Sequence, residues 1–80
     1  MDYRYLKAFL LTAQHQSFSK AAESLKIAQS AVSRQIKLLE ESLDEELIIR
    51  SSKKVILTEK GNSLFVAAQQ FDQLTHEIFD

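Results

Sequence analysis

The N-terminal part of the chain carries the hydrophobic pattern of a helix. Its apolar positions recur at spacings of three and four, which places them on one helical face over about residues 3–15: Leu6, Phe9, Leu10 and Ala13. A polar interruption follows, in which Ser19 is expected to cap a second, short helix over residues 20–25. A break of about three residues then separates this helix from the next periodic segment.

The third periodic segment has two chemically different faces. An apolar stripe repeats every three to four residues and predicts a buried face: Val32, Ile36, Leu39 and Leu43. Hydroxyl and basic side chains recur at the same helical spacing on the opposite side: Ser30, Ser33, Arg34 and Lys37. Because this second face has no carboxylate before Glu40, it is suited to a negatively charged partner.

Two short β-branched segments come next, at residues 47–49 and 55–57, with a polar, basic stretch between them. This pattern predicts a two-stranded hairpin with a cationic tip. Since two strands alone are marginally stable in water, the hairpin is expected to lie on the helices. A short helix, a tight break, a helix with a basic outer face and a hairpin together predict a winged helix-turn-helix.

A fourth helix of about 20 residues is expected to follow, capped by Thr58, with Glu59 in its first turn. Its apolar positions step by three and four: Leu64, Ala67, Phe71, Leu74 and Ile78. The first part of this helix, with Leu64, Phe65 and Ala68, is expected to join the core. Such a helix is about as long as the domain is wide, so its distal stripe is expected to form a dimer seam: Phe71, Leu74 and Ile78.

Composition narrows the functional classes. The 80 residues suffice for one domain, and the absence of cysteine excludes disulfides and cysteine-based metal sites. The longest apolar run has five residues, at positions 64–68, so no membrane span or signal-peptide core is predicted. His15 and His76 have no helical partner at metal-ligand spacing, and no nucleophile motif is present. We therefore expect neither an enzyme nor a metal site.

The net charge of −1 conceals an uneven distribution. Residues 26–37 carry three cations and no acid, and residues 47–60 carry a local charge of +3. Between them, residues 38–46 contain five acids, interpreted as a solvated helix end that faces away from any nucleic acid. Screening limits the reach of exposed charges to about 10 Å, so the two basic segments matter more than the sum.

The stretch SFSKAAESLKIAQSAVSRQIKLLEESL, followed by RSSKKVILTEKG, is similar to the N-terminal DNA-binding domain of LysR-type bacterial transcriptional regulators. The resemblance covers nearly the whole chain. It implies a winged helix-turn-helix over residues 1–58 and a linker helix over residues 59–80 that pairs two subunits. The larger effector-binding domain that normally follows in this family is expected to be absent here.

The resemblance also implies roles for particular residues. Positions on the recognition helix are expected to reach bases or backbone in the major groove: Gln29, Ser30, Ser33 and Arg34. Lys37 is expected further along that face, near phosphates. Three cations are expected on the wing, at the adjacent minor groove or the backbone: Arg50, Lys53 and Lys54.

The chain departs from the family at several turns. Gln16, Asp44 and Ser52 stand where glycine is common, and aspartate at a helix C-terminus can take the left-handed conformation only at some cost. Ala28 replaces a capping serine, which should cost about 1 kcal/mol unless Ser30 takes over. Proline is common in the family at position 30, where this chain has serine.

Two isoleucines occupy wing positions that are usually charged: Ile49 and Ile56. They are interpreted as a cross-strand pair that stiffens the wing, with contact to a partner outside the domain as the alternative.

Together these patterns predict sequence-specific binding of double-stranded DNA by a dimer on a pseudo-palindromic promoter site. No cofactor is expected, because an inducer would bind only the missing effector domain. The full-length protein is expected to form higher oligomers, to contact RNA polymerase and to lie in the bacterial cytoplasm, at the nucleoid. Two alternatives remain: a winged-helix DNA binder of the MarR type, and a protein-interaction module that has lost DNA binding.

Overall fold

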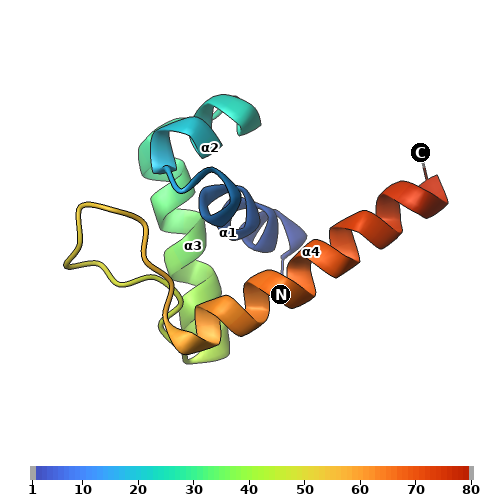
Figure 1. Ribbon diagram of the computed structural model, residues 1–80. Helices are drawn as coiled ribbons and strands as arrows, with labels where there is room; N and C mark the ends of the chain where they lie inside the picture. Colours follow the sequence, from blue (N-terminus) through green and yellow to red (C-terminus); the bar gives the residue numbers. More distant parts are fainter. Residues whose placement is uncertain (1, 80) are drawn as a thin grey trace.

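Four helices and one long loop make up the computed structural model, which describes the backbone of residues 2–79 and the side chains of residues 2–77 (Figure 1). The helices follow one another along the chain: α1 (Tyr3–His15), α2 (Phe18–Leu25), α3 (Gln29–Leu43) and α4 (Glu59–Phe79). The first three form a bundle, and α4 extends away from it (Figure 1). This order and the extents of α1, α3 and α4 are those that the hydrophobic periodicity predicts.

The start of α2 differs from the prediction. Ser17, and not Ser19, is its N-cap, and the Ser17 hydroxyl accepts a hydrogen bond from the Lys20 amide at 3.1 Å. Ser19 lies inside the first turn. The reason is Phe18, which packs against the hydrophobic core and so belongs to the helix rather than to the preceding turn.

Left-handed residues end the first three helices. Gln16, Lys26 and Asp44 have φ values of 52°, 59° and 53°. The expectation that Asp44 takes this conformation in place of glycine is confirmed, at a cost of about 1–2 kcal/mol for a side chain there. Ser52 does not share it: its hydroxyl instead accepts a hydrogen bond from the Lys54 amide at 3.1 Å, so a side chain helps to turn the wing tip.

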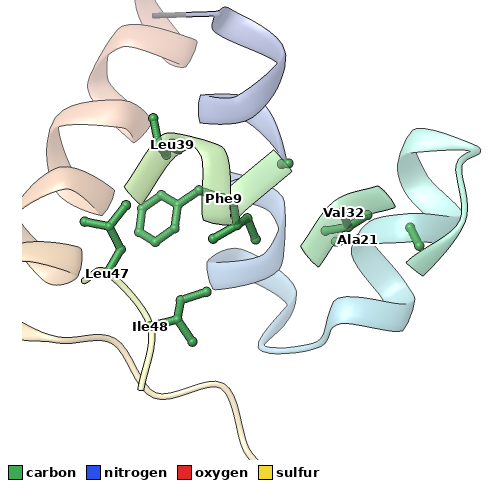
Figure 2. Packing of buried hydrophobic residues seen from close by; sticks show 9 residues of the cluster. Phe9, Ala21, Val32, Leu39, Leu47 and Ile48 are labelled. Carbon is green, nitrogen blue, oxygen red and sulfur yellow. The ribbon is translucent and has the colours of Figure 1, made fainter. Parts of the chain in front are cut away.

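The core lies where α1 crosses α2 and α3 (Figure 2). The stripe predicted on α3 is buried, with Val32, Ile36 and Leu39 fully inaccessible. Phe9 of α1 and the loop residues Leu47 and Ile48 close the core at the end nearest α4. The loop is therefore anchored by its own apolar side chains to the helices, as the marginal stability of an isolated hairpin requires.

The prediction of two β-strands in the wing is wrong, because no strand forms among residues 2–79. A single antiparallel bridge joins Ile48 and Leu57, and the Ile49 amide donates to the Ile56 carbonyl at 2.9 Å. The predicted register, with Ile49 opposite Ile56, is present. The Thr58 amide also donates across the loop to the Leu47 carbonyl at 3.0 Å. No strand develops from these contacts, and the Leu47 and Ile48 amides donate to a side chain of α3 instead of across the loop.

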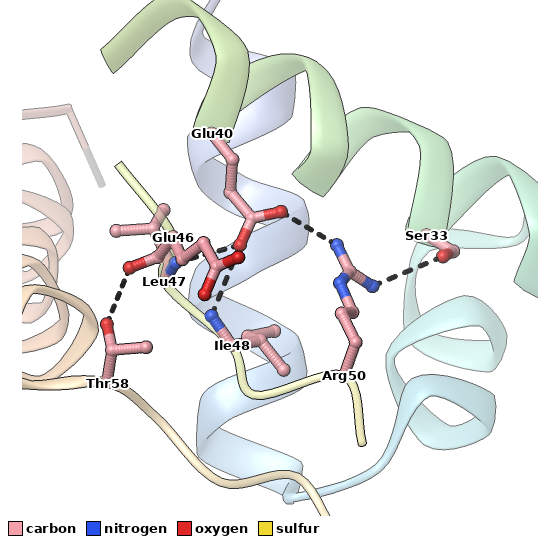
Figure 3. A network of polar contacts seen from close by, with 7 residues as sticks. All are labelled: Ser33, Glu40, Glu46, Leu47, Ile48, Arg50 and Thr58. Atoms are coloured by element: carbon pink, nitrogen blue, oxygen red, sulfur yellow. Dashed lines mark hydrogen bonds and ion pairs between the residues drawn. The ribbon is translucent and has the colours of Figure 1, made fainter. Parts of the chain in front are cut away.

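That side chain is Glu40. Its Oε2 accepts hydrogen bonds from the Leu47 amide at 2.8 Å and the Ile48 amide at 3.2 Å, and its Oε1 accepts one from Arg50 at 2.9 Å (Figure 3). Burial of the carboxylate opposes its ionisation, but these hydrogen bonds outweigh that effect and hold the pKa of Glu40 below its usual value. We call this arrangement the Glu40 clamp; it fixes the loop of residues 47–57, which we call the wing, to α3.

Thr58 and Gly61 attach α4 to the same loop. The Thr58 hydroxyl donates to the Glu46 carbonyl at 2.6 Å and accepts from the Gly61 amide at 3.0 Å, which makes Thr58 the helix cap that the sequence predicts. The Leu47 carbonyl accepts from the Thr58 amide at 3.0 Å. A Cβ on Gly61 would overlap that same carbonyl oxygen, so the close approach of α4 to the loop requires glycine.

Replacing Gly61 by alanine should lower the free energy of unfolding by about 1–3 kcal/mol, because contact with fixed backbone outweighs a helix-propensity gain of about 1 kcal/mol. Urea unfolding followed by circular dichroism measures the difference. Ser63→Ala, exposed in the first turns of α4, is the matched control and should be neutral or slightly stabilising. Equal stability of the Gly61→Ala protein and the wild type would contradict the close approach.

Replacing Glu40 by glutamine should lower the free energy of unfolding at neutral pH by about 1–2 kcal/mol, because hydrogen bonds to a charged acceptor are lost. Ionised Glu40 stabilises the fold above its ordinary pKa of 4.5, and this contribution is lost as the pH falls through the lower pKa of the folded state. The difference from the wild type should therefore shrink in acid.

Chemical denaturation at neutral pH and at about pH 3 tests this expectation. Glu41→Gln, at the exposed neighbouring position, is the control and should change little at either pH. A Glu40→Gln deficit that persists unchanged in acid would show that the carboxylate charge contributes nothing.

Candidate nucleic-acid interface

The outer face of α3 presents the residues that the sequence singles out. Gln29, Ser30, Arg34 and Lys37 are exposed, and Ser33 is half-buried. Neither Arg34 nor Lys37 forms an ion pair with another described residue. Ala28 supplies no side-chain cap to the helix, as expected from the residue type. The face thus combines hydroxyl, amide and uncompensated cationic groups, which suits a polyanion with hydrogen-bonding base edges.

A groove separates this face from the wing. The first turns of α3 contribute Gln29, Ser30 and Ser33, and the loop contributes Ile49, Arg50 and Ser52 on the opposite side. The structure therefore brings three of the five predicted major-groove residues next to one of the predicted wing cations, whereas Arg34 and Lys37 do not line this groove. We refer to this feature below as the α3–wing groove.

Arg50 is not at the tip of the wing. Its guanidinium donates to Glu40 at 2.9 Å and to Ser33 at 3.5 Å (Figure 3). The guanidinium also lies 5.9 Å from the centre of the Phe18 ring. Lys53 and Lys54, by contrast, are exposed in the turn between the two bridged segments and pair with no described acid. The three predicted wing cations thus divide into one held against α3 and two at the tip.

The interpretation of residues 38–46 as a solvated helix end is wrong for Glu40, whose side chain is only 13% exposed and organises the Glu40 clamp. The other four acids of this segment are exposed: Glu41, Asp44, Glu45 and Glu46. A signal was present, because Glu40 lies four residues after Ile36 and three before Leu43, at the edge of the apolar stripe.

The exposed face of α4 bears on the predicted dimer seam. Leu64 and Phe65 pack against the core and Ala68 is buried, so the expected division of the helix is confirmed for its first half. Further along, Phe71 is 48% and Leu74 51% exposed. The side chain of Ile78 lies outside the described residues. The seam itself stays a prediction.

Asp72 fixes the direction of α4 relative to α1. It accepts hydrogen bonds from Lys7 at 2.7 Å and from the Tyr3 hydroxyl at 3.2 Å, and Tyr3 also contacts the Phe71 ring at 5.9 Å. The hydrogen bond from Lys7 is the main reason why the pKa of Asp72 lies below its usual value. No periodic signal pointed to this contact, because it joins residues 65 positions apart.

Other site types find no support in the part of the chain that the structure describes. It contains no group of three or more histidine, cysteine or acidic side chains that could hold a metal ion. None of its helices combines the length and hydrophobicity needed to cross a membrane.

Known proteins resemble this chain in sequence. Residues 3–62 match the family of bacterial regulatory helix-turn-helix proteins called the lysR family. The HTH-type transcriptional regulator IlvY of Escherichia coli K12 is 43% identical over 98% of the chain, and the glycine cleavage system transcriptional activator of the same strain is 45% identical over 88%. The chain spans 28% and 23% of these relatives.

Solved structures resemble it in fold. The crystal structure of the BenM_DBD complex with catB site 1 DNA superposes with a TM-score of 0.91 at 37% identity, covering 98% of this chain and 87% of that one. Vibrio fischeri DarR in complex with DNA superposes with a TM-score of 0.85 at 35% identity, covering 98% and 27% of the two chains. Sequence, helix order and superposition agree: the chain belongs to the lysR family of bacterial regulatory helix-turn-helix proteins.

Proposed function

We propose that this chain is the DNA-binding part of a LysR-type transcriptional regulator, which binds double-stranded DNA in a sequence-specific manner. The observation that carries the proposal is the outer face of α3, where unpaired Arg34 and Lys37 stand beside exposed hydroxyl and amide groups. Two structures that superpose on the chain are complexes with DNA, which supports the same partner here. The MarR-type alternative is set aside by the family match.

The residues of α3 have distinct roles in this proposal. Arg34 can donate two hydrogen bonds to guanine, and Gln29 can pair with adenine in the same groove. Ser30 and Ser33 suit bases or phosphates, while Lys37 lies further along the helix, where it can meet a phosphate. Lys53 and Lys54 at the wing tip are assigned to the adjacent minor groove or its phosphates, and Arg50 to a backbone contact.

The exposed side of α4 is assigned to dimerisation through Phe71, Leu74 and Ile78. Large apolar side chains half exposed on one helix favour burial against a second copy. A two-fold dimer would place two α3 helices in successive major grooves on one side of a pseudo-palindromic site.

The proposal extends to a whole regulator, since the chain spans only 28% and 23% of the relatives it matches. An effector-binding domain following α4 would hold a small-molecule inducer, and the complete protein would act at promoters in the bacterial cytoplasm, at the nucleoid, as a higher oligomer together with RNA polymerase. No catalytic role is assigned to the chain.

Arg34→Ala should weaken binding to the preferred duplex by about 1–3 kcal/mol, because a bidentate base contact is lost. Arg34→Lys is the matched control: it keeps the charge and the salt dependence but loses base discrimination. Fluorescence anisotropy at two salt concentrations, on a duplex selected from a random library, measures both quantities. Affinity that is independent of salt, or unchanged in Arg34→Ala, would favour a protein-interaction module.

Phe71→Asp should produce monomers in sedimentation, because a charge would be buried in the proposed seam. Gln70→Asp, at the exposed preceding position, introduces the same charge and should leave the dimer intact. Circular dichroism of both variants checks that the contact between Phe71 and Tyr3 is not required for folding. An unchanged dimer in Phe71→Asp would remove the seam assignment.

A further inference from the structure

We propose that the α3–wing groove seats one sugar–phosphate unit of the DNA backbone, with Arg50 as its phosphate ligand and Glu40 as the residue that positions Arg50. This inference rests on the proposed function and makes it more specific, because it separates Arg50 from the tip cations. Lys53 and Lys54 would contact DNA at a different place, through long flexible side chains, whereas the Arg50 guanidinium is held in place.

The lining of the groove matches the two halves of a nucleotide backbone unit. Hydroxyl groups of Ser30, Ser33 and Ser52 and the guanidinium of Arg50 supply hydrogen-bond donors for phosphate oxygens. Phe18 and Ile49 supply apolar surface that a deoxyribose ring can cover. None of the residues that line the groove is acidic, although five acids lie within residues 38–46 of the same helix and loop.

Arg50 is already oriented for such a contact. Its guanidinium has five N–H donors, and the contacts to Glu40 and Ser33 engage one terminal nitrogen each, which leaves donors for a phosphate. Phe18 lies beside the group, and the Arg50 side chain is still 42% exposed. Because Glu40, Ser33 and Phe18 hold the guanidinium before DNA arrives, little side-chain freedom is lost on binding.

The position of the groove favours backbone over base. When a recognition helix lies in the major groove and a wing reaches the adjacent minor groove, the sugar–phosphate strand between those grooves must pass between helix and wing. The α3–wing groove is that place. It also accounts for Ile49, which is 38% exposed and therefore is not buried against Ile56 in a closed cross-strand pair.

The test replaces single phosphates of the selected duplex, one at a time, by uncharged methylphosphonate. For the wild type, one position in each half-site, between the bases read by α3 and the site of the wing tip, should lower affinity about tenfold when neutralised. Arg50→Gln should bind the native duplex about tenfold more weakly and show no further loss at that position. Arg50→Lys should restore part of the sensitivity.

Lys53→Gln is the control, because it should keep the sensitivity at this phosphate while losing it elsewhere. A purely structural role for Arg50 would lower affinity for every duplex equally, so an Arg50→Gln protein that keeps the wild-type pattern would overturn the inference. A wild type that binds DNA with no sensitive phosphate in that interval would overturn it too. A wild type that binds no duplex would instead refute the proposed function.

Discussion

The candidate DNA-binding surface depends on the hydrogen bonds that the Glu40 carboxylate accepts. This carboxylate comes from the buried edge of α3 and accepts hydrogen bonds from two consecutive loop amides and from Arg50. Those amides would otherwise need partners in a second strand, since unpaired buried donors are costly. The Glu40 side chain therefore replaces the hydrogen bonds that strand pairing would supply in a hairpin. A single bridge between Ile48 and Leu57 is then enough to hold the two sides of the wing together. The wing is held more by its hydrogen bonds to α3 than by pairing within the wing.

The same loop also determines where α4 begins. The Leu47 residue donates its amide to Glu40 and uses its carbonyl to accept from Thr58, so α3 and α4 meet through one peptide segment. Gly61 allows the helix backbone to approach that carbonyl closely. At its other end, α4 is tied to α1 through Lys7 and Asp72. Displacing α4 would thus disturb the segment that positions the wing, which links the proposed dimer helix to the proposed DNA surface.

Local periodicity and turn chemistry were sufficient to predict most of the fold. The stripe on α3, the Thr58 cap and the left-handed Asp44 depend on residues near one another in sequence, and such signals can be seen in the chain alone. The Ser19 cap and the two strands were predicted wrongly because tertiary contacts decide both features. Phe18 packs against the core and places the start of α2, and Glu40 accepts the hydrogen bonds of the loop amides. The Lys7–Asp72 contact could not be predicted because nothing local specifies it. The candidate reading face was predictable because exposure follows from the stripe opposite it.

The clamp also changes how the charge of the chain acts. Glu40 compensates Arg50 at 2.9 Å, so this pair contributes little field beyond its own surroundings. Under the proposed function, long-range attraction would come from exposed cations that pair with no described acid, among them Arg34, Lys37 and the two tip lysines. Screening over about 10 Å makes each local group of charges matter more than the sum over the chain. A net charge of −1 is therefore compatible with a polyanionic partner. Under the proposed function, the exposed cations would attract the duplex, whereas Arg50, already held in place, would act only once the DNA backbone has entered the α3–wing groove.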